Sequence, residues 1–297
     1  MLKKTALKDS KNLNKKAGHA SKVADILYYG GMSLLAILLI FPFYYMFARS
    51  FMTGSQVMEL PTQILPAPFS LDGWVLLFVE SKYYNYVFTT LLIVLFNIVA
   101  VPLSASFVAY GFAKLEYTGK NLLFAVMMAT MMLPGIVLQT PLYILFNRLG
   151  WLNTILPLTI PNLFGGGAIY IFLVRQYMIG IPRELDEAAK IDGANFARRF
   201  LFITLPLCVP ILVFVVVTVF GASWNDFYGP LIYMSNMDKM PLATAIYLDV
   251  TSGSFVTQDK ANARMAAGVF MSVLPAVLFV IFQKQLIEGV STSALKG

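Results

Sequence analysis

The chain of 297 residues is 58% hydrophobic and only 12% charged, with a mean hydropathy of +0.73. Soluble domains carry about 25% charged residues, so this composition excludes a soluble globular protein and predicts an integral membrane protein. The formal net charge of +7 is concentrated beside apolar segments rather than on a polar surface, which argues against a nucleic-acid partner.

Few residues are suited to catalysis or metal binding. Cys208 is the only cysteine, so no disulfide can form within the chain, and its place in an apolar run indicates a packing residue. His19 is the only histidine, and no cluster of His, Cys and carboxylates has the spacing of a metal site. No glycine-rich phosphate loop occurs either. We therefore predict no catalytic residue, no metal site and no cofactor in this chain, which is not expected to be an enzyme.

Residues 1–25 form a basic leader with seven lysines, and residues 26–48 form an apolar run long enough to cross a bilayer. A cleaved secretory signal is the competing interpretation, but the run is too long and no A-x-A cleavage site follows it. We interpret the run as the first of six spans. A loop that contains three prolines, residues 49–83, comes next.

Five more apolar runs are predicted to span the membrane, separated by polar turns and loops. They cover residues 86–112, 122–146, 155–177, 205–227 and 265–282. Breaks are expected at Pro134-Gly135 and Pro141 in the third span and at the three glycines 165–167 in the fourth. Close helix packing through small residues is one interpretation of these glycines; a hinge between two states of the bundle is the other, and the two are compatible. The sequence thus predicts an all-α, polytopic membrane protein with six transmembrane helices.

Six spans place both termini on one side of the membrane, and the distribution of positive charge indicates which side. Of the 22 Lys and Arg residues, sixteen lie in the leader, the turn between the second and third spans, the segment 175–199 and the tail. The other six lie on the opposite side. This bias predicts that both termini and the loop 181–206 are cytoplasmic.

The segment 184–210 is a polar island between two apolar runs. Pro182 suits the first turn of a helix, and the acidic residues after it lie where the helix dipole favours negative charge. Gly193 is expected to end this helix in a left-handed conformation. A second short helix is expected after Asn195, and Leu205-Pro206 is expected to end it. The product is a short helix, a turn and a return to the membrane.

The same segment resembles the EAA motif of permease subunits of ABC-type importers. The matching residues are Glu187, Ala188, Ala189, Asp192, Gly193, Ala194, Ile203, Leu205 and Pro206. The resemblance implies that the loop 181–206 contains a cytoplasmic coupling helix, which docks into a cleft on an ATPase subunit. The letters EAA alone would favour an interfacial amphipathic helix or a solvated loop, whereas the glycine and the Leu-Pro at their expected distances favour the coupling helix.

The outer end of the fifth span carries candidates for a translocation path, in a segment similar to one of carbohydrate-importer permeases. These candidates are Trp224, Asn225, Asp226 and Tyr228. The amide and the carboxylate offer hydrogen bonds to a sugar hydroxyl, and the aromatic rings offer a stacking surface. An ordinary aromatic belt at the membrane interface is the alternative.

Two further segments gain an interpretation from the resemblance. The external loop, residues 228–263, would dock an extracytoplasmic solute-binding protein, and residues 248–262 would probe its cleft; a flexible connector is the alternative. The tail, residues 283–297, would reach between ATPase subunits, as in maltose-type sugar importers. A disordered terminus is the alternative for the tail.

The resemblance runs from the first span to the last residue and is closest to the smaller, six-span permease of oligosaccharide importers. It implies a permease domain over residues 26–297 in a bacterial or archaeal cell membrane. The implied partners are a second, related permease, an ATPase dimer that binds ATP and Mg, and an external binding protein that delivers a sugar. Uptake of a phosphorylated polyol such as glycerol phosphate is one alternative. A stand-alone secondary carrier is the other, although the spans hold almost no ionisable groups.

Overall fold

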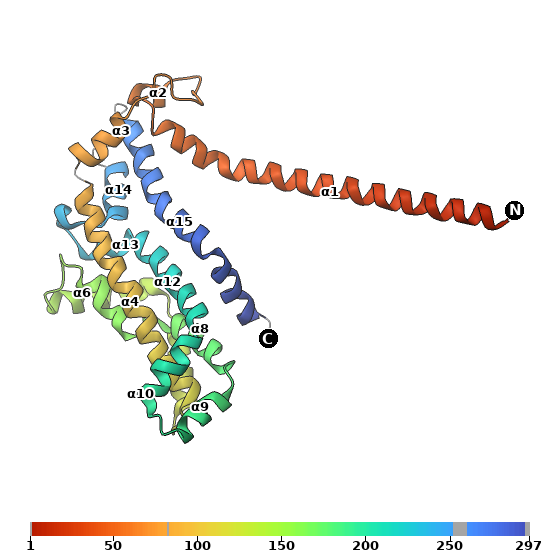
Figure 1. Cartoon of the computed structure of the whole chain (residues 1–297). Coiled ribbons are helices and arrows are strands. Elements are labelled where there is room, and N and C mark those ends of the chain that lie inside the picture. Colours follow the sequence, from red (N-terminus) through yellow and green to blue (C-terminus); the bar gives the residue numbers. More distant parts are fainter. Residues whose placement is uncertain (1, 82, 252–259, 295–297) are drawn as a thin grey trace.

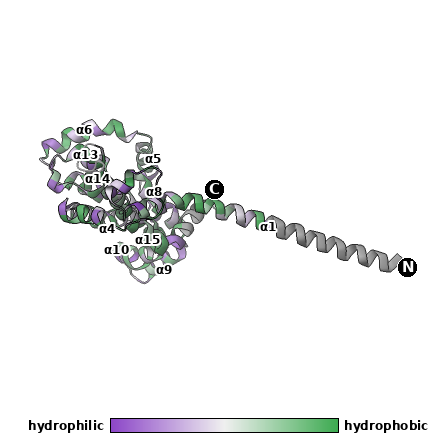
Figure 2. Ribbon diagram, turned by 90° about the horizontal axis from the view of Figure 1, so that it is seen from above, coloured by the Kyte–Doolittle hydropathy of each residue, from purple (hydrophilic) through white to green (hydrophobic). Residues whose placement is uncertain are grey.

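The computed structural model describes residues 2–81, 83–251 and 260–294, with side chains between residues 25 and 286 within these ranges. Every regular element in these ranges is a helix. The body is an elongated bundle of helices from which the first helix projects (Figure 1). Hydrophobic residues occupy most of the body and of the described part of the first helix (Figure 2). The all-α prediction is confirmed.

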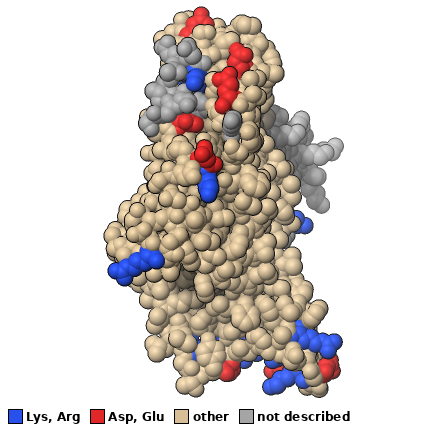
Figure 3. All heavy atoms as spheres, turned by 90° about the vertical axis from the view of Figure 1, so that its left-hand side faces the viewer, with Lys and Arg blue, Asp and Glu red and all other residues tan. Residues whose placement is uncertain are grey.

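The described part of the chain holds four to six candidate membrane spans. Four helical segments are long and apolar enough by themselves: Asp25–Arg49, Tyr84–Lys114, Leu156–Ile179 and Ala261–Leu286. Two bent pairs also qualify if each is counted as one span: Lys120–Thr130 with Gly135–Arg148, and Phe196–Leu207 with Val209–Trp224. Charged side chains gather towards the two ends of the body, and the broad middle carries few (Figure 3). Each of the six predicted runs overlaps one of these segments, and the fifth differs most in its bounds.

Helix α1 (Leu2–Arg49) joins the predicted leader and the first span in one continuous helix. From Asp25 to Phe43 its side chains are exposed. The helix meets the body near its C-terminal end, where Met46 lies against Gly268 of the last helix and Ala48 is buried. Most of this apolar span therefore stays uncovered in the single chain.

The segment between the first and second spans is held against the start of the last helix. Asn262 is buried, and its Nδ2 donates to the carbonyl of Met52 at 3.0 Å. Gly73 approaches the Asn262 backbone so closely that a Cβ at this position would lie 2.9 Å from the Asn262 carbonyl carbon. The segment contains α2 (Gly54–Met58), α3 (Asp72–Val75) and the π-helical turn η1 (Leu76–Glu80).

The second span is the centre of the bundle. It is α4 (Tyr84–Lys114), and it packs against α8 (Ala168–Ile179) and α12 (Val209–Trp224). Ala105 and Ala109 of α4 are fully buried against Val174 and Val215 of these neighbours. Lipid tails are as apolar as these helices, so no hydrophobic effect drives the spans together. Small residues instead allow the helix backbones to approach closely and make van der Waals contacts.

A buried amide network crosses the middle of the bundle. Asn97 of α4 is 3% exposed, and its Nδ2 donates to the Leu158 carbonyl at 3.1 Å and to Ser223 Oγ at 3.0 Å. Its Oδ1 accepts a hydrogen bond from Asn162 Nδ2 at 3.1 Å. One side chain therefore joins the second, fourth and fifth spans.

We expect Asn97→Leu to lower the stability of the detergent-solubilised protein by about 2 kcal/mol, since it removes three interhelical hydrogen bonds of about 0.6 kcal/mol each. A fall in thermal unfolding temperature would measure this loss. Asn85→Leu is the matched control because Asn85 is exposed on the same helix. Equal unfolding temperatures for the two variants would contradict a stabilising role for the network.

The third span is broken where Pro134-Gly135 predicts. Helix α5 (Lys120–Thr130) and helix α6 (Gly135–Arg148) meet at 96°. Pro134 has an extended conformation, so the helix cannot continue through it. Pro141 lies inside α6, which continues through it, so the break expected at Pro141 is wrong.

The fourth span is interrupted at its glycines. It consists of α7 (Leu156–Thr159), the 3-10 turn η2 (Ile160–Phe164) and α8. Gly165, Gly166 and Gly167 all have positive φ, at +95°, +62° and +116°. Other residues rarely adopt these conformations. The freed Gly165 N–H donates to Ser104 Oγ of α4 at 3.1 Å, which satisfies a backbone group that the broken helix leaves unpaired.

The fifth span begins earlier than the sequence predicts, so the expectation that Leu205-Pro206 ends the short helix is wrong. The helix runs from α10 (Phe196–Arg199) through the π-helical turn η3 (Phe200–Thr204) into α11 (Leu205–Leu207). Pro206 directly follows the π-helical turn η3, and its missing N–H removes one backbone hydrogen bond near the end of this helix. The break comes instead at Cys208, where the direction changes by 76° before α12 begins.

The predicted external loop and the predicted tail contain more helix than expected. Residues 228–263 include α13 (Tyr228–Tyr233), η4 (Met237–Lys239) and α14 (Leu242–Thr251). Residues 252–259, in the segment expected to probe a binding protein, lie outside the described residues. The last helix, α15 (Ala261–Ala294), extends past the predicted end of the sixth span at residue 282, and so the tail up to Ala294 is helical.

Candidate coupling helix and translocation path

The polar island folds as a helix with a closed C-terminus. Helix α9 (Arg183–Ile191) carries acidic residues in its first turn and Lys190 in its last, which suits the helix dipole at both ends. Gly193 has φ +78°. Its N–H donates to the Lys190 carbonyl at 3.1 Å, and the Ala194 N–H donates to the Ala189 carbonyl at 2.9 Å. This is a Schellman arrangement, and the predicted left-handed end at Gly193 is confirmed. Pro182 lies one residue before the helix, as its N-cap.

Helix α9 lies at the end of the body far from α2 and α3 (Figure 1) and presents an open face. Glu187, Ala188 and Asp192 are exposed, and Ala189 is half-buried. Ile191 is 87% exposed and Leu185 is 46% exposed. Two exposed aliphatic side chains beside a small residue form a surface suited to a hydrophobic groove.

The second short helix, α10, packs back onto the central span. It begins after Asn195, as the sequence predicts, and Asn195 caps it by accepting a hydrogen bond from the Arg198 N–H at 2.9 Å. Phe196 and Phe200 make edge or tilted contacts with the ring of Tyr110 at centroid distances of 5.1 and 5.3 Å. Leu205 is half-buried and packs at the edge of the same core. The polar island is therefore fastened to α4 instead of standing free.

Three polar residues at this junction were not singled out from the sequence. Asp186 Oδ2 pairs with Arg199 Nη1 at 2.7 Å, and Asp186 Oδ1 accepts a hydrogen bond from Tyr110 at 3.3 Å. Asp186 and Arg199 lie in one loop with opposite charges, which is a weak signal for a pair. Tyr110 is 76 positions from Asp186 along the chain, and no sequence pattern connects them.

The four path candidates separate into different environments. Trp224 is 2% exposed, its Nε1 donates to the Met271 carbonyl at 3.0 Å, and its ring stacks on Phe220. It is part of the core between α12 and α15. Asn225 is exposed, and its Nδ2 donates to the Gly221 carbonyl at 2.9 Å, which leaves its side-chain oxygen available.

Asp226 supports local structure, and Tyr228 bridges two segments. Asp226 Oδ1 accepts a hydrogen bond from the Gly229 N–H at 2.9 Å in the first turn of α13. Burial raises the pKa of the Asp226 carboxyl, and the backbone N–H groups of Gly229 and Tyr228 oppose that rise by stabilising its charged form. The Tyr228 hydroxyl donates to Gln139 Oε1 of α6 at 2.9 Å.

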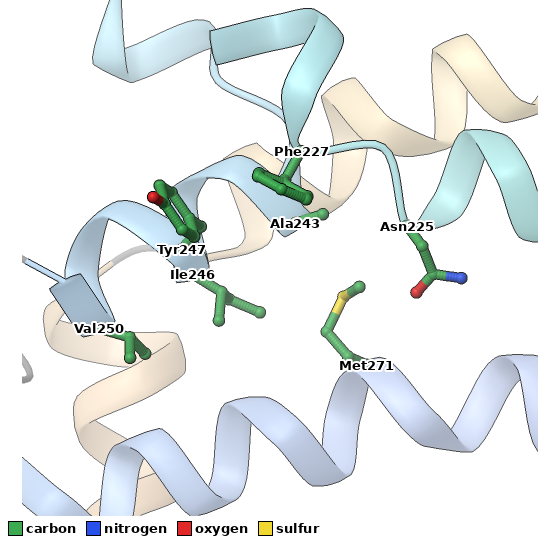
Figure 4. Close-up of a pocket in the computed structure, with 7 residues that line it drawn as sticks. All are labelled: Asn225, Phe227, Ala243, Ile246, Tyr247, Val250 and Met271. Atoms are coloured by element: carbon green, nitrogen blue, oxygen red, sulfur yellow. The ribbon is translucent and has the colours of Figure 1, made fainter.

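A cavity of about 230 Å³ opens between α14, α15 and the turn after α12. Asn225 lies at one end and Val250 at the other, with Tyr247 and Phe227 along one wall (Figure 4). The rings of these two aromatic residues lie 5.0 Å apart. Of the four path candidates, only Asn225 lines this cavity. The full lining is Asn225, Phe227, Ala243, Ile246, Tyr247, Val250 and Met271.

Within the described residues, no group of three or more His, Cys, Asp or Glu side chains is placed to hold a metal ion. The candidate site consists of the exposed helix α9 at one end of the bundle (Figure 1) and an apolar cavity lined by Phe227 and Tyr247 near α14.

Comparison with protein families gives one match that covers most of the chain. Residues 101–292 match the model of the family described as binding-protein-dependent transport system inner membrane component. The match includes α9, the broken fourth span and the cavity.

Individual relatives are distant but nearly full-length. The chain is 28% identical to the arabinooligosaccharides transport system permease protein AraQ of Halalkalibacterium halodurans, over 90% of this chain and 95% of AraQ. It is also 28% identical to the maltodextrin transport system permease protein MdxG of Bacillus subtilis, over 95% of this chain and 99% of MdxG. A chain of a bacterial ABC transporter involved in alginate import shares the fold, with a TM-score of 0.78 at 20% identity over 89% of this chain and 97% of that chain.

Proposed function

Because the chain belongs to the binding-protein-dependent transport system inner membrane component family, we propose that it is the permease subunit of an ABC importer for a sugar or oligosaccharide. The observation that carries this proposal is the Schellman-capped helix α9, exposed with Glu187, Ala188 and Ile191 at one end of an apolar bundle. Relatives named for arabinooligosaccharides and maltodextrin support a carbohydrate as solute.

The partners follow from which surfaces the single chain leaves open. Helix α9 would dock on an ATPase subunit, which would bind ATP and Mg and perform the hydrolysis. The span of α1 is exposed in the single chain and is therefore open to packing against another span. A second, related permease would supply that span. The outer loop would receive an external solute-binding protein.

The orientation follows from the charge distribution. The lysine-rich leader and the basic residues near α9 would lie in the cytoplasm, together with both termini. That arrangement exposes α9 to the compartment that holds ATP. The outer segment with α2, α3 and α14 would then face the external binding protein.

Transport would couple closure of the ATPase pair to movement of the bundle. ATP binding would draw the two α9 helices of the permease pair together, and the spans would open outward to receive solute. The breaks at residues 165–167 and at Cys208 would act as hinges. The helices on either side of each break could change their relative direction there while remaining regular. Hydrolysis would reset the bundle.

The cavity near Asn225 is the proposed outer part of the solute path. Aromatic faces such as those of Phe227 and Tyr247 suit the apolar face of a sugar ring, and Asn225 offers one hydrogen-bonding group. So few polar groups select weakly between sugars, and most of the selection would rest on the binding protein.

The test is affinity purification of the tagged chain in mild detergent, identification of co-purifying proteins, and assay of ATPase activity. We expect an ATPase and a second permease to co-purify, with hydrolysis stimulated by solute and its binding protein. We expect Glu187→Lys to abolish that stimulation, because it reverses an exposed charge on α9. Glu116→Lys is the control, since Glu116 is also an exposed glutamate but lies outside the coupling loop.

Two other outcomes would select the alternatives. Recovery of the chain alone, with uptake by purified chain in liposomes under an ion gradient and without ATP, would establish a secondary carrier. A co-purifying binding protein that prefers a phosphate ester to a neutral sugar would establish uptake of a phosphorylated polyol.

A further inference from the structure

We propose that Asp186, Arg199 and Tyr110 form a latch that fixes the coupling loop to the end of α4 and passes the movement of α9 to that span. The inference rests on the proposed function. It assigns three positioning residues to the transport cycle, none of which would touch ATP or solute.

The ion pair at the centre of the latch is largely shielded from water. The Asp186 and Arg199 side chains are only 18% and 15% exposed, and Asp186 Oδ2 lies 2.7 Å from Arg199 Nη1. A pair that is partly desolvated is screened less by salt than an exposed surface pair. Arg199 Nε is buried and has no hydrogen-bond partner among the described residues. The pair is joined by one hydrogen bond, from Arg199 Nη1 to Asp186 Oδ2, and not by the firmer bidentate form.

Adjacent acidic residues of α9 point to different sides. Successive residues on a helix are about 100° apart, and accordingly Glu187 is exposed whereas Asp186 turns inward towards Tyr110. Glu187 can meet a partner protein while Asp186 holds the helix to its own bundle. One helix thereby has an outer face and an inner face with separate tasks.

An aromatic cluster stiffens the same junction. Phe196 and Phe200, on either side of the Arg199 position, pack against Phe107 and Tyr110 of α4 with centroid distances between 5.1 and 6.1 Å. Aromatic pairs at these distances contribute about 0.5–1.5 kcal/mol each beyond their buried area. If the coupling loop is displaced, we therefore expect α4 to move with it, because the packed rings prevent the loop from sliding along α4.

Two more contacts tie the C-terminal part of α4 to the chain before α9. Lys114 Nζ donates to the Ile181 carbonyl at 2.9 Å, directly before the coupling helix. Arg175 Nε of α8 donates to the Phe112 carbonyl at 3.3 Å. The C-terminal part of α4 therefore contacts the chain both before α9, at Ile181, and after it, at Phe196.

Helix α4 also touches the break in the fourth span. Val101 lies against Gly166, and Asn97 is hydrogen-bonded to Leu158 in α7 and to Asn162 within η2. A shift that enters α4 at Tyr110 therefore reaches the glycines at residues 165–167 through direct packing. This continuous path of contacts is the reason for assigning transmission to α4.

The experiment uses the complete transporter, purified with its partners and reconstituted with binding protein and solute. The readout is the number of solute molecules transported per ATP hydrolysed, which a purely structural contact would leave unchanged in assembled complexes. We expect Arg199→Ala to lower this ratio about three- to tenfold. We expect the charge exchange Asp186→Arg with Arg199→Asp to restore a large part of it. Arg198→Ala is the matched control, because Arg198 is exposed on the same short helix.

Asp186→Asn keeps the shape of the side chain and removes its charge, so it repeats the test if Arg199→Ala assembles poorly. A wild-type transport ratio in assembled complexes of both variants would overturn the latch, and so would an equal loss in Arg198→Ala. If the wild-type chain assembles with no ATPase, the proposed function itself is wrong, and the latch falls with it.

Discussion

Replacing Gly193 with aspartate should leave the protein in the membrane and separate ATP hydrolysis from solute uptake. Gly193 has φ +78°, and a Cβ there would meet open space, so the cost is backbone strain of about 1–2 kcal/mol and not a clash. The chain relieves such strain by changing its path after α9. That change would displace the helix from its docking position, and we expect uptake per ATP hydrolysed to fall at least about tenfold, which corresponds to about 1.4 kcal/mol of coupling.

Solute-stimulated ATPase and uptake, measured on the same assembled complexes, would check this result. Gly119→Asp is the matched control, because Gly119 has a similar φ of +84° and equally open surroundings but lies in the turn before α5. Normal coupling in Gly193→Asp would contradict a role for the shape of the α9 terminus. Equal uncoupling by Gly119→Asp would show that any strained turn at this end of the bundle has the same effect.

Gly166→Ala is expected to have the largest effect on stability. The new Cβ would lie 2.6 Å from Val101 Cγ2 while the residue holds φ +62°. Overpacking typically costs about 1–3 kcal/mol, and left-handed backbone adds about 1–2 kcal/mol. We expect a marked fall in thermal unfolding temperature and in the yield of folded protein in detergent.

The second substitution Val101→Ala separates the two contributions, because it removes both Cγ atoms and leaves the backbone strain. The double variant should therefore recover the overpacking part only. Gly150→Ala controls for strain alone, since Gly150 has φ +69° and no atom within contact of a Cβ. If Gly166→Ala is no less stable than Gly150→Ala, the tight contact between α4 and the break does not exist as described.

The burial of Trp224 and the exposure of Asn225 illustrate a limit of sequence reasoning. Both were candidates for the path because of their chemistry and their place after an apolar run. Trp224 instead fills the core and bonds to Met271, whereas Asn225 borders the cavity. A span that is apolar all round carries no periodic signal to show which face packs, so neighbouring residues could not be separated before the helices were placed.

The features that the sequence alone determined are those that depend on residues close together in the chain. Long apolar runs located the membrane segments, because a helix that crosses the bilayer needs about 20 consecutive apolar residues and such runs can be read from the sequence. Pro134-Gly135 and residues 165–167 marked two breaks, and Gly193 marked the end of α9, because these conformations depend on the residue itself and its chain neighbours. The EAA-like spacing pointed to residues 181–206 as the proposed coupling loop, because the resemblance rests on residue types at fixed distances along the chain.

Only the tertiary structure decided how these elements meet. The contact of Tyr110 with Asp186 and the approach of Gly166 to Val101 join segments far apart in the chain. Such contacts depend on which faces of α4, α8 and α12 pack together. That choice is made by shape and by a few buried polar groups, since hydrophobicity is uniform across the spans and favours no particular pairing.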